Sequence, residues 1–508
     1  MTALTRRQIL AGGFGLASLG ALAACSSGSS MGDMPGMGGA TTSSASTGHA
    51  MGAIPTATPL TPKPGQKVVT ATLRPRPVTL DLGGIHANTW AYTDELGTAP
   101  FRASAGDLLR ITVDNQLPSD TSVHWHGIRV RNVADGVPGV TQQPIAKGAR
   151  YLYEFEAPDA GTYFFHPHTG VQIDRGLYAP LVIDDPKDKG GYDAEWVVVL
   201  DDWTDGIPGG KNPDTILADF QAKTGPISTG MNHDMSGMDH GMASPLGDAG
   251  DIAYPHYLIN GRIPAAPRTF TAKPGQKVRI RFINAGSDTI FKVALGGHTM
   301  TVTHSDGYAV QPQDTKALYI AMGERYDVLV TLADGAFPLA AAPEGKKGTP
   351  ALAVVRTGAG TAPTPSTPVS ELAGAALVGT SLTAADAAKL SSKDPARTVD
   401  VQLNGQMKPY AWGINGKKFG EDTPMQVREG ERLRMRMTNM TMMAHPMHIH
   451  GHTWALPASG GLRKDTVLVL PMQTVEADLQ ADNPGTWMYH CHNIYHAELG
   501  MMTSLRYA

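Results

Sequence analysis

The residues of this chain best suited to chemistry are histidines that occur in pairs with one residue between them. Four such pairs lie at HWH (124–126), HPH (166–168), HIH (448–450) and HCH (490–492). The last pair encloses Cys491, one of only two cysteines in the chain. Imidazole and thiolate groups are ligands for transition metals, and chance rarely produces the same spacing of histidines four times. The four pairs together predict a metal-binding protein.

The first and third pairs occupy the same place in two copies of a repeat. The segments GDLLRITVDN (106–115), GQKVRIRFIN (275–284) and GERLRMRMTN (430–439) each begin with glycine, alternate apolar and polar residues, and end with asparagine. In the outer copies the histidines stand nine and eleven residues after that asparagine, where the middle copy has Val293 and Leu295. Because side chains alternate along a strand, this spacing places both histidines of a pair on one face.

The second pair of each outer copy follows a glycine at a fixed distance. Its histidines stand five and seven residues after Gly161 in the first copy and after Gly485 in the third. In the middle copy the same offsets from Gly335 fall on Ala340 and Ala342. The repeat therefore predicts three homologous β-domains, of which the outer two bind metal and the middle one serves as a spacer or wall.

Length and composition agree with several β-domains. The 508 residues exceed one ordinary core, and the 58 glycines and 37 prolines with short apolar runs indicate a turn-rich β-protein. The pattern predicts domains at residues 65–185, 192–358 and 396–508, with a Pro/Thr-rich linker at 359–395 before the last one. Charged residues make up 17% of the chain and the net charge is −4, which disfavours nucleic acid as a partner.

The N-terminal segment has the features of an export signal. TRRQIL (5–10) carries the paired arginines of a twin-arginine signal, and LAAC (22–25) looks like a bacterial lipobox. Residues 1–25 are therefore predicted to be a twin-arginine lipoprotein signal, with Cys25 as the lipid-modified residue unless that cysteine is incidental. Residues 26–64 are predicted to be a flexible Met/Ser/Gly-rich tether. We expect the protein to be exported through the twin-arginine pathway, with the lipid anchor as its only contact with a membrane. Its expected location is the outer face of the bacterial cytoplasmic membrane, or elsewhere in the periplasm or cell envelope.

The ligand types indicate which metal the histidines bind. With Cys25 assigned to anchoring, Cys491 has no intramolecular disulfide partner. Clustered carboxylates are lacking, which disfavours magnesium, calcium and manganese, and a structural zinc knuckle usually has several cysteines. His445, Cys491 and His496 can form a two-histidine, one-thiolate set, with Met501 ten residues past the cysteine. That is the ligand set of a blue-copper electron-transfer site with a long axial methionine. The paired histidines would then form a second, histidine-only cluster between the outer domains.

The motifs HWHG, HPH, HPMHIHGH and HCHNIYHAELGM resemble the four copper signatures of multicopper oxidases with three cupredoxin domains. The resemblance covers residues 65–508 and implies an all-β fold of three cupredoxin-like Greek-key β-sandwich domains. It also implies four copper ions, one of type 1, one of type 2 and two of type 3. The implied ligands are His445, Cys491, His496 and axial Met501 for type 1, His124 and His448 for type 2, and His126, His166, His492 and His168, His450, His490 for the two type 3 ions.

The resemblance further implies an oxidase that couples one-electron oxidation of a substrate at the type 1 copper to four-electron reduction of O₂ to water at the trinuclear cluster. Cys491 lies covalently between His490 and His492, so an electron on its sulfur has a short through-bond route to both type 3 ions. Storing four electrons before the O–O bond breaks avoids the release of superoxide or peroxide.

Proton supply to such a cluster needs carboxylates. Asp135 matches the family's acidic residue near the type 2 copper, although a turn-forming role before Gly136 is the alternative. Many relatives have a glutamate directly after the second type 1 histidine, whereas this chain has Ala497 there and Glu498 next. That departure puts the second proton donor in doubt and leaves Glu498 as a candidate only.

Methionine-rich segments bear on the substrate. MNHDMSGMDHGM (231–242), within an insert at 229–243, has four methionines and two histidines, and further methionines crowd around His445. Thioethers are soft ligands that suit Cu(I), and a loop of biased composition is the alternative interpretation of the insert. Met435 and Met437 are expected to pack inward. The surface candidates are Met440, Met442 and Met443.

These features favour a cuprous oxidase in copper tolerance, with laccase-like activity on phenols and aromatic amines and with Fe(II) as a further reductant. Two alternatives stay open. One is a general laccase without a role in copper tolerance, and the other is a copper-sequestering protein that does not turn over. A copper nitrite reductase is disfavoured because it lacks a type 3 pair.

Overall fold

The computed structural model describes residues 54–508 except 98, 189, 230–243 and 249. All of these residues belong to one compact unit that spans residues 47–508. The predicted signal (1–25), most of the tether and nearly all of the Met/His-rich insert therefore lie outside the described residues. In the described part, no helix is both long and apolar enough to cross a membrane.

Strands dominate the described residues and form three successive β-sandwiches, which confirms the predicted all-β fold of cupredoxin-like Greek-key domains. The first sandwich contains β1 (Val68–Leu73), β2 (Arg76–Asp81), β3 (His86–Ala91), β4 (Phe101–Ser104), β5 (Leu108–Asp114), β6 (His124–His126), β7 (Arg150–Glu156), β8 (Gly161–His166) and β9 (Ala179–Asp184). Its sheets have the orders β1-β5-β7 and β4-β9-β8-β6, and β2 and β3 form a separate hairpin.

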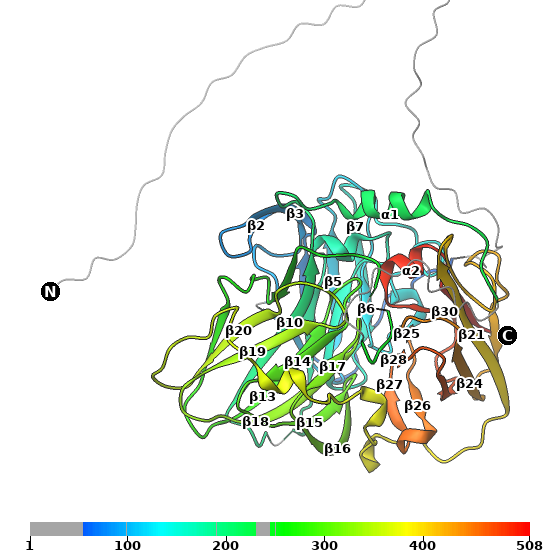
Figure 1. Ribbon diagram of the computed structural model, residues 1–508. Coiled ribbons are helices and arrows are strands. Elements are labelled where there is room, and N and C mark those ends of the chain that lie inside the picture. Colours follow the sequence, from blue (N-terminus) through cyan, green and yellow to red (C-terminus); the bar gives the residue numbers. More distant parts are fainter. Residues whose placement is uncertain (1–53, 98, 189, 230–243, 249) are drawn as a thin grey trace, which may run out of the picture. The chain divides into compact units, whose positions relative to one another are not determined.

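The second sandwich is drawn in green and yellow-green in Figure 1, with β10, β13, β18 and β15 in one layer and β20, β19, β14 and β17 in the other. It contains β10 (Ala194–Trp203), α1 (Pro213–Gln221), β11 (His256–Ile259), β12 (Arg268–Thr271), β13 (Lys277–Asn284), β14 (Phe291–Leu295), β15 (Met300–Ser305), β16 (Tyr308–Thr315), β17 (Leu318–Ile320), β18 (Arg325–Thr331), β19 (Ala336–Pro343) and β20 (Ala351–Arg356).

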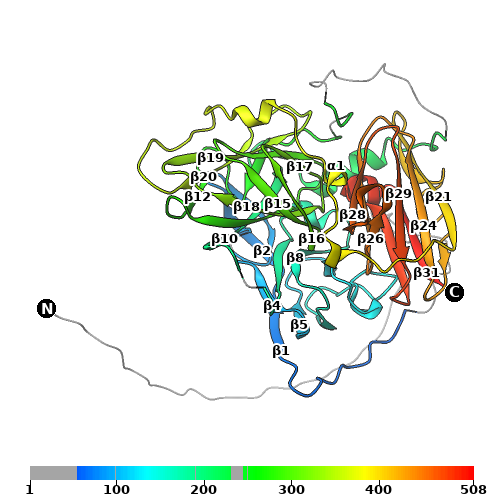
Figure 2. The same cartoon turned by 90° about the horizontal axis from the view of Figure 1, so that it is seen from below.

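The third sandwich is drawn in orange and red in Figure 2. It contains β21 (Arg397–Met407), β22 (Tyr410–Ile414), β23 (Met425–Val427), β24 (Arg432–Asn439), β25 (His445–Ile449), β26 (Trp454–Leu456), β27 (Leu462–Lys464), β28 (Thr466–Val469), β29 (Thr474–Gln480), β30 (Thr486–Cys491), α2 (Ile494–Glu498) and β31 (Met502–Tyr507).

Strand order shows the internal repeat directly. The second sandwich has the sheets β11-β10-β13-β18-β15-β16 and β12-β20-β19-β14-β17. The third has β22-β21-β24-β29-β26-β27 and β23-β31-β30-β25-β28, which is the same order with every strand number raised by eleven. The first sandwich keeps the core of this arrangement, with β5, β6 and β8 in the places of β24, β25 and β30.

The histidine strands pair in matching register in the two outer sandwiches. His124 of β6 lies opposite His166 of β8, and His448 of β25 lies opposite His490 of β30. Directly opposed residues in antiparallel strands project from the same face of the sheet. Strand pairing therefore brings together histidines that are about forty residues apart in each domain.

The middle sandwich differs from the expected alignment by one residue. Val293 of β14 lies opposite Ala341 of β19, so Ala341 occupies the place of His166 and His490, and the predicted positions Ala340 and Ala342 were wrong. The middle copy has one more residue between Gly335 and the paired position than the outer copies have. A one-residue offset reverses the face on which a side chain lies.

The asparagine that ends each repeat has one function in all three sandwiches. Asn115, Asn284 and Asn439 are fully buried, and each Oδ1 accepts the backbone N–H two residues further along. Each Nδ2 donates to two backbone carbonyls, which for Asn439 are those of Met443 (2.7 Å) and Val469 (3.0 Å). The asparagine thus fixes the loop that leads into the histidine strand.

The segments outside the sandwiches also pack against them. In the predicted linker, Leu382 and Ala384 are fully buried, and Leu377 forms a bridge with Leu318 of β17. At the end of the predicted tether, the carbonyl of Leu60 accepts a hydrogen bond from an Arg110 guanidinium N–H at 2.8 Å. Both connections therefore contain residues that contact the β-domains.

Candidate metal centres

One candidate centre lies at the end of the third sandwich, where two strands and a short helix meet. His445 begins β25, Cys491 ends β30 and His496 lies in α2, and all three side chains are fully buried. The Cys491 Sγ atom is 3.7 Å from His445 Nδ1 and 3.8 Å from His496 Nδ1, and the two Nδ1 atoms are 3.3 Å apart. The structure thus brings together the three ligands predicted for a type 1 site.

The outer nitrogens of both rings have other partners. His445 Nε2 lies 2.8 Å from Thr441 Oγ1, and His496 Nε2 lies 3.0 Å from Asp251 Oδ2. The Trp412 ring stacks on His496 with a centroid distance of 4.0 Å. These contacts orient both Nδ1 atoms toward Cys491, as partners of metal-binding imidazoles commonly do.

Met501 is hydrogen-bonded through its backbone to two of these residues, His496 and Cys491. Its side chain is fully buried, its backbone N–H donates to the His496 carbonyl at 2.8 Å, and its carbonyl accepts from the Cys491 N–H at 3.0 Å. Burial raises the pKa of Cys491, and burial followed by the neighbouring His496 lowers the pKa of His445. A bound cation would stabilise the thiolate and neutral imidazoles that a metal site needs.

A second centre contains the eight paired histidines, four from the first sandwich and four from the third. His448 Nε2 is 3.4 Å from His124 Nε2, and His450 Nε2 is 3.1 Å from His490 Nε2. Ring nitrogens within 4.8 Å of one another form three sets, which are His124, His448, His450; His124, His126, His166; and His168, His450, His490. The His492 ring centroid lies 4.8 Å from that of His126 and 5.3 Å from that of His166. The structure therefore gathers all eight predicted residues.

Unpartnered ring nitrogens test whether these residues fit a metal. Within the described residues, the buried nitrogens without a hydrogen-bond partner include His126 Nδ1, His166 Nε2, His168 Nε2 and His492 Nε2. A buried polar atom without a partner is costly, and metal ligation would satisfy it. Burial lowers the pKa of all four imidazoles, which keeps them neutral and able to ligate. Imidazoles together with one thiolate suit copper, so the residues fit this ion.

Asp135 contacts histidines of both outer sandwiches. Its Oδ2 accepts a hydrogen bond from His450 Nδ1 at 2.9 Å, and its backbone carbonyl accepts from His124 Nδ1 at 2.9 Å. Gly136 follows with a φ of 83°, and a Cβ there would lie 1.8 Å from the Val123 carbonyl oxygen. Asp135 therefore stands in a tight Asp-Gly turn and also orients two predicted ligands, so the two interpretations of this residue are compatible.

Glu498 is the last residue of α2, two positions after His496. Its side chain is half-buried, and burial raises its pKa to about 7. A carboxyl with this pKa can exchange protons near neutral pH. Its use as the second proton donor stays a prediction.

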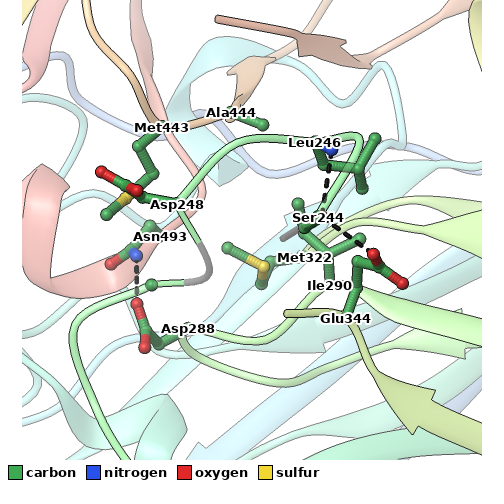
Figure 3. Close-up of a pocket in the computed structure, with 11 residues that line it drawn as sticks. Ser244, Leu246, Asp248, Asp288, Ile290, Met322, Glu344, Met443, Ala444 and Asn493 are labelled. Atoms are coloured by element: carbon green, nitrogen blue, oxygen red, sulfur yellow. Dashed lines mark hydrogen bonds between the residues drawn. The ribbon is translucent and has the colours of Figure 1, made fainter. Parts of the chain in front are cut away.

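We call the centre of His445, Cys491 and His496 the thiolate centre. A pocket lies beside it and is shown in Figure 3. It is lined by Ser244, Leu246 and Asp248, which directly follow the Met/His-rich insert, and by Met443 and Ala444, which directly precede His445. The Asp248 backbone N–H donates to the Met442 carbonyl at 2.9 Å. Of the predicted surface methionines, Met443 is buried in this pocket and Met440 and Met442 are half-buried, whereas Met435 and Met437 are fully buried in the core.

The sequence interpretation missed four residues that contact the predicted ligands. Thr441 and Asp251 hold the outer nitrogens of the thiolate centre. Asp465 and Thr466 contact the histidine cluster, since the Asp465 carbonyl accepts from His448 Nδ1 at 2.9 Å. Of these four, only Thr441 stands close in sequence to the ligand that it contacts. No spacing could therefore have pointed to Asp251, and the dipeptide at 465–466 had no motif to mark it.

Three cupredoxin-like sandwiches with a thiolate centre joined to a histidine-only centre define a copper-dependent oxidoreductase. Multicopper oxidase family models match residues 76–188, 195–360 and 392–508. The chain is 47% identical to the multicopper oxidase MmcO of Mycobacterium tuberculosis, over 99% of this chain and 96% of that protein. It is 30% identical to a copper resistance protein A homolog of Pseudomonas syringae pv. tomato, over 79% of this chain and 86% of that protein. The chain belongs to the multicopper oxidase family.

Solved structures with the same fold extend across the family. The laccase from Botrytis aclada superposes with a TM-score of 0.69 at 24% identity, over 87% of this chain and 88% of that one. A multicopper oxidase from Campylobacter jejuni, described as a metallo-oxidase, gives 0.66 at 22% identity, over 88% and 93%. These likenesses establish the fold.

Proposed function

We propose that this multicopper oxidase couples oxidation of Cu(I), one electron at a time, to four-electron reduction of O₂ to water, and that it also oxidises phenols and aromatic amines. The observation that carries the choice of Cu(I) is the pocket lined by Asp248 and Met443, whose wall also includes Ala444, the residue directly before His445. Relatives named copper resistance protein A support a role in copper tolerance.

The ligand assignment follows the two centres. Type 1 copper would be held by His445, Cys491 and His496 with Met501, type 2 copper by His124 and His448, and the type 3 coppers by His126, His166 and His492 and by His168, His450 and His490. Bound copper supplies the one-electron redox chemistry that side chains lack. The rings of His126, His166 and His492 lie 4.8–5.7 Å apart by centroid, and each carries a nitrogen without a hydrogen-bond partner, which supports their assignment to a single ion.

The chain's own residues hold the ligands and move protons. The Asp251 carboxylate fixes the His496 ring by accepting at Oδ2, and Tyr410 donates its hydroxyl to the same oxygen. Asp135 accepts from His450 Nδ1 and is placed to pass a proton into the cluster region. Glu498, with a pKa near 7, can act as the second proton carrier. Iron(II) is a further reductant that the type 1 site could accept.

The pocket offers the donors that a cuprous ion prefers. Met443 supplies a thioether and Asp248 a carboxylate, and a second thioether comes from Met322 on the opposite wall (Figure 3). Burial and the charge of Asp251, three residues along the chain, raise the pKa of Asp248. A cation in the pocket would relieve that repulsion, and soft sulfur donors favour Cu(I) among the available cations.

The test compares two reductants in matched variants. We expect Met443→Leu and Asp248→Asn to lower kcat/KM for Cu(I) at least tenfold while changing kcat/KM for a small phenol less than twofold. Met437→Leu is the control, because Met437 is equally buried but packs in the core. Equal losses on both reductants would show that the pocket does not select Cu(I), and unchanged Cu(I) kinetics would remove the pocket from catalysis.

We also propose that the protein is exported through the twin-arginine pathway and anchored by a lipid on Cys25. The paired arginines at 6–7 and the LAAC sequence support this location. In the native host, replacing both arginines with lysine should keep the protein in the cytoplasm. Cys25→Ser should abolish labelling with a radioactive fatty acid, and continued labelling would refute the anchor.

A further inference from the structure

The middle sandwich supplies none of the predicted ligands, yet it touches the histidine cluster. The contact is made by residues 321–324, which connect β17 to β18. Gly323 lies so close that a Cβ added there would be 2.8 Å from His492 Cδ2 and 3.0 Å from His126 Cε1. Its φ of 82° also lies in the left-handed region that favours glycine. This connection therefore forms part of the wall of the cluster.

Two residues further on, Arg325 joins the three sandwiches at one guanidinium. Its Nη1 and Nη2 donate to Asp465 Oδ1 and Oδ2 at 2.6 Å and 2.7 Å, and its Nε donates to the Thr162 carbonyl at 3.0 Å. Thr162 belongs to the first sandwich, Arg325 to the second, and Asp465 to the segment between β27 and β28 of the third. Arg325 and Asp465 are both fully buried. A Cβ at Gly127 would lie 2.3 Å from Arg325 Nη2, so this glycine makes room for the guanidinium.

Asp465 transmits this contact to the predicted ligands. Its backbone carbonyl accepts from His448 Nδ1 at 2.9 Å, and its Oδ1 lies 3.3 Å from His126 Nε2. The neighbouring Thr466 places its hydroxyl 3.2 Å from the same His126 nitrogen. The segment that Arg325 holds therefore orients one ring predicted for type 2 copper and one predicted for type 3 copper.

The bidentate pairing also controls the Asp465 carboxylate itself. A carboxylate oxygen of Asp465 lies within 4.8 Å of ring nitrogens of His126 and His448, so these three residues resemble a metal-binding set of their own. Arg325 occupies both carboxylate oxygens and compensates their charge. A guanidinium is suited to this task, because its planar fork matches both oxygens at once.

A second buried charge cluster supports the first. Lys464 Nζ lies 3.0 Å from Asp306 Oδ2 and 3.0 Å from Glu324 Oε1, and Asp306 Oδ2 also accepts the Thr466 N–H at 3.2 Å. Burying so many charges brings little net stability, because desolvation offsets the Coulomb attraction. The middle sandwich supplies a large part of this network. A need for fixed geometry therefore explains the network better than a gain in stability does.

We propose that Arg325 is a positioning residue of the trinuclear cluster, through which the middle domain fixes Asp465 so that Asp465 orients His448 and His126 without competing as a ligand. This rests on the proposed assignment of the histidines to type 2 and type 3 copper. Removing a group that orients a metal ligand typically weakens metal binding about 10–100-fold.

The test is the copper-loaded protein carrying Arg325→Lys, which keeps the charge but loses the bidentate fork. We expect type 2 copper to be removed by a chelator at about 10–100-fold lower concentration and its electron paramagnetic resonance spectrum to change. Type 1 absorption should stay as in the wild type. The matched control is Arg279→Lys, because Arg279 makes a similar buried pair with Asp327 in the same sheet but contacts no predicted ligand.

Three outcomes separate the possibilities. If Arg325→Lys and Arg279→Lys lower the melting temperature alike and both keep the wild-type type 2 spectrum, Arg325 is merely structural and the proposal is refuted. If Arg325→Lys does not fold, Asp465→Asn provides the second test, and a normal type 2 spectrum in that variant would refute the proposal equally. If the wild type itself shows no type 2 signal, the ligand assignment fails first and this proposal falls with it.

Discussion

The asparagines that end the three repeats allow one substitution to be compared in two domains. Asn439→Ala removes the donations to Met443 and Val469 and the acceptance from Thr441. Asn284→Ala removes the equivalent three backbone hydrogen bonds in the middle sandwich. At about 1 kcal/mol each, either change should cost about 3 kcal/mol, and more where a buried carbonyl stays unpaired.

The two variants should differ at the thiolate centre. Asn439 Oδ1 also accepts from the Thr441 hydroxyl at 2.8 Å, and the same hydroxyl lies 2.8 Å from His445 Nε2. In the described residues, the Asn284 Oδ1 accepts from the Gly286 N–H, and no hydroxyl group links it to a ligand predicted for type 1 copper. We therefore expect Asn439→Ala to shift the blue type 1 absorption and its reduction potential, and Asn284→Ala to leave both unchanged.

The assay combines calorimetry of the copper-free proteins with absorption spectroscopy of the copper-loaded ones. A loss of about 3 kcal/mol corresponds to a melting temperature lower by about 6–24 °C, because each kcal/mol lowers it by about 2–4 °C in a larger domain and about 4–8 °C in a smaller one. The reasoning would be refuted if both variants shifted the blue band equally. It would also be refuted if Asn439→Ala lowered the melting temperature and left the band in place.

Three further predictions follow from the site. Cys491→Ser should abolish the blue colour and reductant-driven oxygen uptake while the circular dichroism spectrum stays unchanged. If this variant still consumed oxygen, the type 1 assignment would be refuted. Deleting residues 231–242 should weaken Cu(I) turnover at low copper more than phenol turnover, whereas equal effects would exclude the insert from the mechanism. Gly136→Ala should be strongly destabilising because its Cβ would lie 1.8 Å from the Val123 carbonyl oxygen. Gly139→Ala is the control, because this glycine also has a positive φ but open space around it, and it should cost about 1–2 kcal/mol of stability. Similar melting temperatures of the two variants would contradict this.

The fold and the residues that gather in the two centres were predictable because both depend on local rules. Alternation along a strand puts both histidines of a pair on one face, and the Gly-to-Asn repeat marks the strand that precedes them. The same rules predicted that Met435 and Met437 pack in the core, where the structure has them fully buried. The error at Ala340 arose because an offset counted from Gly335 ignores one extra residue before the paired position.

The residues that hold the ligands were not predictable in this way. Asp251 follows the insert of the middle domain and meets His496, which is 245 residues away in the chain. Arg325 meets Asp465 across 140 residues. Such contacts form where one sandwich packs against another, and the periodicity within a strand gives no information about them. A sequence pattern therefore finds ligands more readily than the groups that orient them.

The two centres are joined because one strand pair serves both of them. On β25, His445 and Met447 point to one face and His448 to the other, and on β30 Cys491 and His490 are separated in the same way. Met447 pairs with Cys491 and His448 pairs with His490, so each face of the two strands belongs to a different centre. A single peptide unit then links the thiolate to the neighbouring imidazole, and the His490 Nδ1 donates to the Cys491 carbonyl at 2.7 Å. Shifting either strand by one residue would exchange the faces and destroy both centres together. The spacing His-Cys-His is therefore a requirement of strand geometry as much as of the proposed electron transfer.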